Sequence, residues 1–286
     1  MNAPTLDIGV LKTWIGNSKS STDAIRPGPV ALMAATLGLK DGLLEDGAPL
    51  PAPWHWLYFL EATGRDALGR DGHAALGQFM PPVDLPRRMW AGGKFDFRAP
   101  LCIGESIRKV STINHVERKS GRSGELCFVT VRHQFFAGDE LRLSEDHDVV
   151  YCQDRQPGED SPTPPLPPYE PDIIETVTPE PVLLFRYSAL TFNSHRIHYD
   201  VDYCRDIEGY PGLVVHGPLT ATLLLDLARR QAGAATLSDF SYRALSPLFH
   251  THPFTIALRR DNNNLHVWAT NPDGNMAMTA SAHLSD

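Results

Sequence analysis

At residues 219–230 the sequence reads LTATLLLDLARR, a run that is apolar on almost every side until its last residues. A helix of this composition is buried on most of its faces. Proline precedes it at position 218, where the first turn of a helix tolerates the missing N–H. Four runs with strand character follow, at residues 239–245, 254–260, 265–271 and 276–284. The C-terminal part of the chain is therefore predicted to be a buried helix wrapped by an antiparallel sheet.

Strands also dominate the middle of the chain. Polar and apolar residues alternate at residues 94–97, and long runs with strand character follow at residues 107–117, 126–136 and 141–151. The glycine-containing turns between them are typical of neighbouring antiparallel strands. This pattern predicts a meander, and with a helix at residues 30–37 it is consistent with a second helix-and-sheet unit.

Shorter elements are expected on either side of these runs. The aromatic residues 54–59 are expected to form a strand that enters a helix, and residues 182–187 a short strand. A polar loop is expected from there to about residue 212. The glycine-rich stretches 90–93 and 121–124 lack the spacing of phosphate-binding loops, so we expect both to be turns.

Prolines divide the chain near its middle. Residues 157–181 hold a large share of the 24 prolines in the sequence. Proline removes backbone donors and favours extended geometry, so this stretch predicts a semi-rigid linker. A length of 286 residues is typical of two domains. We predict an N-terminal domain at residues 1–155, a linker at 156–181 and a C-terminal domain at 182–286 that carries the chemistry.

Composition disfavours several classes of protein. The net charge of −8 disfavours binding to nucleic acid, since no basic patch offsets it. No apolar run approaches the ~20 residues of a membrane-spanning helix, and residues 1–7 lack the features of a signal peptide. The expected location is the cytoplasm, with reduced cysteines. No CxxC pair is present, which removes the strongest zinc and redox signals from the four cysteines, Cys102, Cys127, Cys152 and Cys204.

The richest polar run, at residues 185–200, reads FRYSALTFNSHRIHYD. It places imidazole, guanidinium, amide and carboxylate groups between apolar elements. His216 and Gly217 follow, where the buried helix begins. The free N–H groups at a helix start, together with the helix dipole, can polarise a carbonyl or hold an oxyanion.

The run from Asn193 to Gly217 resembles the signature of MaoC-like enoyl-CoA hydratases, Asp-x-Asn-Pro-(Ile/Leu/Val)-His followed by a His-Gly helix start. Nearly the whole chain resembles the branch with two hot dog domains. That branch contains type 2 hydroxyacyl-thioester dehydratases, mesaconyl-C4-CoA hydratase and itaconyl-CoA hydratase. The first half matches it through Asp84-Leu85-Pro86, Trp90-Ala91-Gly92-Gly93, Pro100-Leu101 and Gly121-Arg122-Ser123-Gly124. The resemblance implies an α+β double hot dog fold, whose two sheets pair edge to edge, and no metal or redox cofactor.

The resemblance also implies roles for three residues. His198 takes the place of the family's catalytic histidine, and a pKa near 6.5 suits proton transfer at neutral pH. Asn193 stands where the family has aspartate. It cannot act as a base, but its amide can orient water. The N–H groups around Gly217 would polarise the thioester carbonyl.

The departure at position 193 leaves the second proton-transfer group open. His198 could act alone, or His195 or Asp200 could share the task. Structural alternatives exist as well. Asn193 could cap a turn through its side chain, and His216 could serve only the entry of the helix. The spacing of His195 and His198 could also belong to a metal site, but no further Cys or His set completes one.

The expected reaction is the reversible hydration of a short branched dicarboxylic 2-enoyl-CoA, itaconyl-CoA or mesaconyl-C4-CoA, to a 3-hydroxyacyl-CoA such as citramalyl-CoA. Guanidinium groups pair bidentately with carboxylates or CoA phosphates. The residues expected to bind substrate are Arg186, Arg196, Asp200, His216 and Arg243. Acyl-CoA is the expected small-molecule partner, and the chain is expected to form a homodimer. The alternatives are a 3-hydroxyacyl-thioester dehydratase of fatty acid synthesis and a non-catalytic acyl-CoA-binding hot dog protein.

Overall fold

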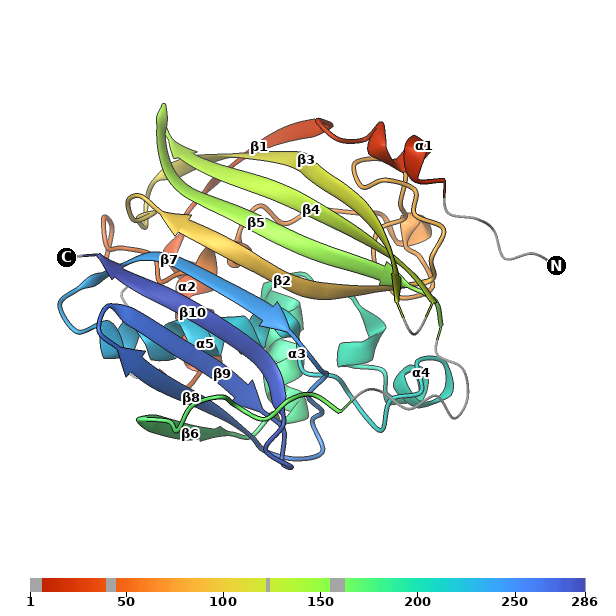
Figure 1. Ribbon diagram of the computed structural model, residues 1–286. Coiled ribbons are helices and arrows are strands. Elements are labelled where there is room, and N and C mark those ends of the chain that lie inside the picture. The colour runs from red at the N-terminus through yellow and green to blue at the C-terminus, as the bar shows by residue number, and fades with distance from the viewer. Residues whose placement is uncertain (1–6, 40–44, 122–123, 155–162, 286) are drawn as a thin grey trace.

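The computed structural model describes residues 7–39, 45–121, 124–154 and 163–285. Within these ranges the strands form one antiparallel sheet in the order β1-β3-β4-β5-β2-β7-β10-β9-β8-β6 (Figure 1). The strands from β1 to β2 in this order belong to the N-terminal half. The strands from β7 onward follow residue 155. Two sheets therefore meet edge to edge inside one chain, as expected.

The strands of the N-terminal half are β1 (Ser18–Ala24), β2 (Arg87–Phe97), β3 (Ser106–Gly121), β4 (Gly124–Ala137) and β5 (Glu140–Cys152). The predicted meander corresponds to β3, β4 and β5 and to the end of β2. β1 was not expected. The predicted turn at residues 121–124 falls partly outside the described residues. The strands that follow residue 155 are β6 (Ile173–Val177), β7 (Thr236–Ala244), β8 (Phe254–Asp261), β9 (Asn264–Thr270) and β10 (Met276–Ser285).

The seam between the two halves is the pairing of β2 with β7, in which Gly92 lies opposite Arg243. A Cβ on Gly92 would lie 2.5 Å from the carbonyl oxygen of Tyr242. The register of β2 against β5 also shifts between Trp90 and Gly92. The expectation of a turn at residues 90–93 is therefore wrong. The glycines are explained by the close approach of a neighbouring backbone and not by a chain reversal.

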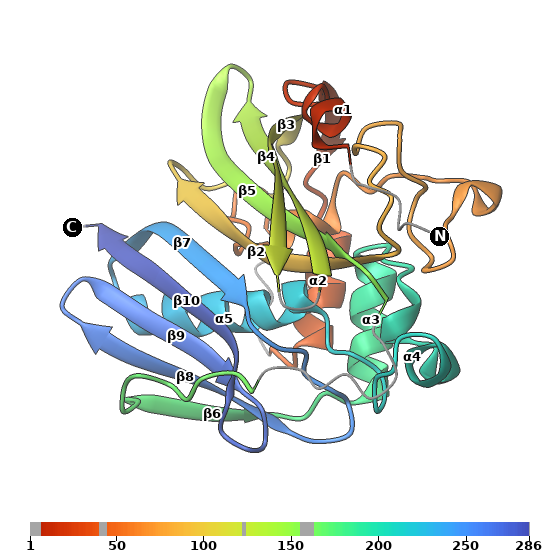
Figure 2. The same ribbon diagram turned by 45° about the vertical axis from the view of Figure 1, so that its right-hand side comes forward.

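Helix α5 (Gly217–Ala232) lies along the inner side of the C-terminal strands (Figure 2). Leu219, Leu224 and Leu227 are completely buried, which confirms the predicted buried helix. Helices α2 (Pro27–Thr36) and α3 (Pro181–Leu190) pack against each other near one end of α5. The remaining helical segments are α1 (Ile8–Lys12), η1 (Trp54–Leu57), η2 (Arg65–Ala67), η3 (Arg196–His198) and α4 (Val201–Asp206).

Several local predictions are corrected by the structure. The expected strand at residues 182–187 is helix α3, because Leu184 and Tyr187 lie three residues apart on one buried face. The expected strand at residues 54–59 is the short helix η1. The expected polar loop after α3 contains η3 and α4. Finally, β6 lies inside the predicted linker and pairs with β8, so the end of this proline-rich stretch adds a strand.

One hydrophobic core joins the two halves. It includes Val30 and Met33 from α2, Phe95 from the seam strand β2, and the buried leucines of α5. A second cluster, which includes Ile113 and Val129, lies within the N-terminal half. Among the described residues, no helix is long and apolar enough to cross a membrane.

Candidate active site

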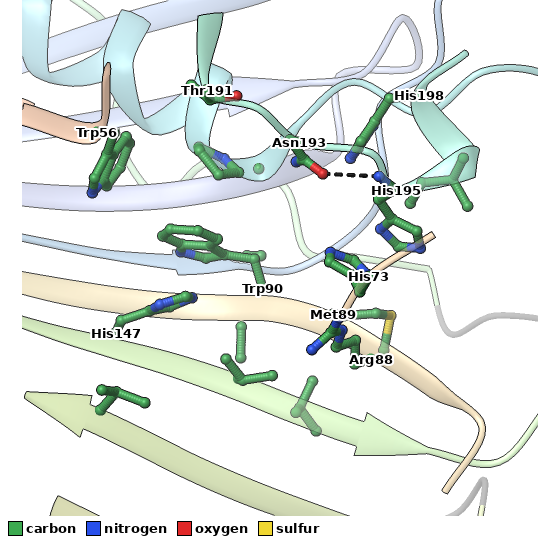
Figure 3. A pocket seen from close by; sticks show the side chains of 18 of the residues that line it. Trp56, His73, Arg88, Met89, Trp90, His147, Thr191, Asn193, His195 and His198 are labelled. Carbon is green, nitrogen blue, oxygen red and sulfur yellow. Dashed lines mark hydrogen bonds between the residues drawn. The ribbon is translucent and has the colours of Figure 1, made fainter. Parts of the chain in front are cut away.

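A cavity of about 1160 Å³ opens between the two halves. The C-terminal half supplies Asn193, His195 and His198 to one wall, and Figure 3 shows them facing Trp90 and His147 of the N-terminal half. The residue that begins α5, Gly217, also lines the cavity. The three residues expected to be catalytic are therefore brought to one place.

The side chain of His198 is held by a hydrogen bond to the backbone. Its Nδ1 lies 2.7 Å from the carbonyl oxygen of Val214, an acceptor, so Nδ1 carries the proton and donates it. This bond fixes the tautomer and leaves Nε2 unprotonated toward the cavity. The side chain is only 5% exposed, and burial lowers the pKa of His198 to about 4. The imidazole is therefore neutral at pH 7 and can accept a proton through Nε2.

His216 lies behind His198 and does not line the cavity. The two rings stack with centroids 3.6 Å apart, and Nε2 of His216 is 2.8 Å from the hydroxyl of Ser188. His216 is completely buried, and its pKa is lowered by burial and by the neighbouring His198 and His195. His216 thus fixes the plane of the His198 ring and holds the start of α5 against α3.

The side chain of Asn193 caps a turn, as one of the alternatives for this residue predicted. Its Oδ1 accepts a hydrogen bond from the backbone N–H of His195 at 3.0 Å (Figure 3). The chain reverses just before it, at Phe192, which adopts a left-handed φ of 49°. Non-glycine residues rarely take this conformation, and they cluster at functional sites. Because Oδ1 serves the turn, the NH₂ group is the part of Asn193 left for the cavity.

A loop from the N-terminal half is hydrogen-bonded to the segment at residues 193–198. The backbone N–H of Arg196 donates to the carbonyl of Asp71 at 2.9 Å, and the Ser194 hydroxyl donates to the carbonyl of Gly72. A Cβ on Gly72 would lie 2.1 Å from the carbonyl oxygen of Ser194, so this contact requires glycine. His73 is thereby placed in the cavity wall beside His195, with ring centroids 4.3 Å apart.

Asp71, His73 and His195 are the described residues whose side chains come together as metal ligands would, with ligand atoms within 4.8 Å of one another. The Asp71 carboxylate already accepts a bond from Nδ1 of His73 at 2.9 Å. It also lies 3.6 Å from Nε of Arg88, a cation that competes with any metal ion for this carboxylate. The expectation of no metal stays a prediction.

A second polar cluster lines the cavity within the N-terminal half, and the sequence analysis missed it. Its centre is the buried Glu145, which accepts bonds from Trp56 and pairs with His55, both at 2.9 Å. Burial would raise the pKa of Glu145, but the bond and charge of His55 outweigh it and lower this pKa. His147 stacks on Trp90 with centroids 3.6 Å apart. Polar residues at alternate positions of β4 and β5 were the available signal.

The residues expected to bind substrate do not all reach the cavity. Arg243 does line it, from the exposed end of β7. Arg186 does not, and points outward from α3. Arg196 and Asp200 bind each other instead, with Nη2 and Oδ2 2.8 Å apart, and Asp200 caps α4. The geometry therefore gives no support to substrate contacts by Arg186, Arg196, Asp200 or His216.

The family model for hydroxyacyl-thioester dehydratase type 2 matches residues 53–250 of this chain. The chain belongs to the hydroxyacyl-thioester dehydratase type 2 family. The predicted resemblance is confirmed, and with it the class of enzyme, a hydro-lyase of the hydratase and dehydratase group. Mesaconyl-C4-CoA hydratase of Chloroflexus aurantiacus is 44% identical over 274 residues, which cover 95% of this chain and 96% of that protein.

A second relative is the mitochondrial hydroxyacyl-thioester dehydratase type 2 of Schizosaccharomyces pombe. It is 27% identical over 280 residues, which cover 89% of this chain and 91% of that protein. A MaoC-like dehydratase structure from Phytophthora capsici superposes with a TM-score of 0.71 at 12% identity, over 98% of this chain and 99% of that one. A double hot dog protein of Mycobacterium tuberculosis superposes with a TM-score of 0.56 at 14% identity, over 95% and 96%. The predicted α+β double hot dog fold is confirmed.

Proposed function

We propose that this member of the family hydrates a short dicarboxylic 2-enoyl-CoA reversibly, with mesaconyl-C4-CoA as the leading substrate and citramalyl-CoA as the product. The 44% identity to mesaconyl-C4-CoA hydratase over nearly the full length supports this choice. The observation that carries the chemistry is the neutral His198, whose Nε2 faces a cavity that the helix start at Gly217 also lines.

The thioester carbonyl is polarised at the start of α5. The first N–H groups of a helix have no partner within the helix, and the helix dipole adds a positive potential there. Pro218 has no N–H, so the amide of Gly217 is the donor that reaches the cavity wall. A hydrogen bond to the carbonyl oxygen makes C3 of the enoyl group electrophilic and stabilises the enolate that forms.

Water is held between Asn193 and His198. The Asn193 NH₂ group donates to the water oxygen, and Nε2 of His198 accepts one of its protons. As the oxygen bonds to C3, that proton passes to Nε2, and the C2–C3 double bond shifts toward the thioester to give the enolate. The imidazolium then returns the proton to C2, which yields the 3-hydroxyacyl-CoA and a neutral His198. Both additions occur on the face of the substrate that His198 occupies.

Most of the cavity wall is apolar, and a polar cluster within it supports a polar acyl group. In the N-terminal half the wall includes His55, Lys109, His133, Glu145 and His147. The expected homodimer and the cytoplasmic location stay predictions.

The test is an assay of the purified protein with mesaconyl-C4-CoA, itaconyl-CoA and crotonyl-CoA side by side. Loss of the enoyl-thioester absorbance measures the rate for mesaconyl-C4-CoA and crotonyl-CoA. Mass spectrometry follows the hydrated product of all three, because the double bond of itaconyl-CoA is not conjugated with its thioester. We expect fast conversion of a dicarboxylic thioester and slow conversion of crotonyl-CoA. A preference for crotonyl-CoA would support the fatty acid dehydratase. Thioester binding without any turnover would support the non-catalytic alternative.

A further inference from the structure

Arg88 is a cavity residue whose guanidinium has no short partner among the described residues. It lies on β2, and its side chain is 18% exposed. Its contacts to Asp71 and Ala74 are long, and it also interacts with the hydroxyl of Tyr151, which lies opposite it on β5. Nε lies 3.6 Å from the carboxylate of Asp71, and Nη2 lies 3.5 Å from the carbonyl oxygen of Ala74. A guanidinium offers five N–H donors, so most of its hydrogen-bonding capacity is unused.

The adjacent arginine shows the contrast. Arg87 is buried, and it donates to Glu208 at 2.6 Å and to the Tyr210 hydroxyl at 2.7 Å. Its charge is satisfied within the fold. The other described cationic residues that line the cavity are Lys19, Arg65, Lys109 and Arg243.

These four residues differ from Arg88 in pairing, exposure or position. Lys19 is paired with Glu61, and Arg65 and Arg243 are exposed. Lys109 lies on β3, within 5.5 Å of the ring of Phe59. Arg88 instead shares its part of the wall with His73, across the cavity from Asn193 (Figure 3).

The charge of Arg88 also affects His195, a residue of the segment at 193–198. The pKa of His195 is lowered to about 3 by burial first and then by the neighbouring His198. The charge of Asp71 opposes this, and the positive charges of Arg88 and Arg87 add to it. His195 in turn lies 5.4 Å from His198, measured between ring centroids. Arg88 thus lies in the part of the wall that holds His73 and His195, and His195 is next to His198 (Figure 3).

We propose that Arg88 binds the free carboxylate of the acyl group and so selects dicarboxylic substrates. The inference rests on the proposed function. In mesaconyl-C4-CoA the free carboxylate is attached to C3, the carbon that receives the hydroxyl group. A cation that binds it must lie near the water that His198 and Asn193 would hold, and Arg88 lies across the cavity from Asn193 (Figure 3). Planar guanidinium binds carboxylate bidentately, which fixes the orientation of C3 as well as its charge.

Asp71 keeps the guanidinium in place without saturating it. The carboxylate is held by Nδ1 of His73 at 2.9 Å, so it stays 3.6 Å from Arg88. The substrate carboxylate can then take the short bonds. Asp71 and His73 are positioning residues in this arrangement, and the loop that carries them is fixed to the segment at residues 193–198 by its bonds to Ser194 and Arg196.

The experiment compares two substrates that differ only at this group. In 3-methylcrotonyl-CoA a methyl replaces the carboxylate of mesaconyl-C4-CoA. We expect Arg88→Met to lower the ratio of kcat/KM for the dicarboxylic over the neutral thioester by roughly 100-fold, the loss of about two charge-assisted hydrogen bonds. The ratio for Arg88→Lys should lie between those of the wild type and Arg88→Met, because lysine keeps the positive charge but cannot bind a carboxylate through two parallel N–H groups. Arg98→Met, at an exposed position just after β2, is the control and should leave the ratio unchanged.

A binding measurement separates this inference from the proposed function. Calorimetry with the saturated pair, 3-carboxybutyryl-CoA and isovaleryl-CoA, needs no turnover. Wild-type protein that turns over neither enoyl thioester refutes the proposed function, whereas weaker binding of the carboxylate ligand alone in Arg88→Met still supports the carboxylate site. The carboxylate site would be refuted if Arg88→Met lowered kcat/KM equally for both enoyl thioesters, or lowered the affinity equally for both saturated thioesters. It would also be refuted by a change of ratio in Lys109→Met with none in Arg88→Met.

Discussion

Acid should destabilise this protein through three buried histidines, two in the cavity wall and one behind it. His195, His198 and His216 are each at most 8% exposed. Burial lowers the pKa of His198 to about 4 and that of His195 to about 3, and that of His216 falls well below its ordinary value. In the unfolded chain each would titrate near 6.5.

The sign follows from proton linkage. Between the folded and unfolded pKa values the unfolded chain binds more protons, so stability is complete above about pH 6.5 and is lost as the pH falls toward 4. For each histidine the loss between pH 7 and pH 5 is about 2 kcal/mol. Because the three rings contact one another, about 6 kcal/mol is a ceiling for the sum. A domain is stable by only about 5–15 kcal/mol, so the effect is large.

The assay is urea unfolding followed by circular dichroism at pH 7, 6 and 5. We expect the free energy of unfolding to fall steadily over this range. His198→Gln removes one titrating group, so its loss between pH 7 and 5 should be smaller than that of the wild type by about 2 kcal/mol. A wild-type free energy that does not change between pH 7 and 5 would show that these imidazoles are solvated, and the argument for a neutral His198 would fail.

Three further predictions concern single substitutions. His198→Ala should lower kcat by at least ~100-fold while thioester binding persists, measured by steady-state kinetics and calorimetry; full activity would contradict the proton transfer at Nε2. Asn193→Asp restores the residue of the family signature, and we expect kcat to fall, because the carboxylate replaces the NH₂ donor to the attacking water; a rise would mean that the amide is a tolerated defect. Gly92→Ala should destabilise the fold by about 1–3 kcal/mol, since its Cβ would meet backbone atoms that cannot rotate away. Gly28→Ala, with open space around the new Cβ, is the control in the same thermal melt.

The sequence predicted the parts of the fold that have a strong period or a long apolar run. The four strands after α5 and the meander from β3 to β5 carry such signals, and the buried α5 does as well. Helix α3 does not, because a short apolar run of this kind is compatible with either a helix or a strand until its packing partner is known. The short helix η1 was not predicted, for the same reason.

The site was predictable only where its residues are neighbours along the chain. The run from Asn193 to His198 and the helix start at Gly217 could be found from their order and spacing. Arg88 and His73 could not, because they reach the cavity from a different half, through the Gly72 contact and the seam strand β2. Arg196 was expected at the substrate because of its proximity in sequence, yet its guanidinium is occupied by Asp200.

The hydrogen-bonded pairing of β2 with β7 has a consequence for how the molecule unfolds. Each of these strands would be an exposed edge if the halves separated, and unpaired edges are templates for association with other chains. Neither half can then open without leaving the backbone groups of the other unsatisfied, and the shared hydrophobic core binds them further. The two hot dog units should melt in one cooperative transition, and a chain cut at the proline-rich stretch should yield fragments that aggregate when apart and recover a closed cavity only when mixed.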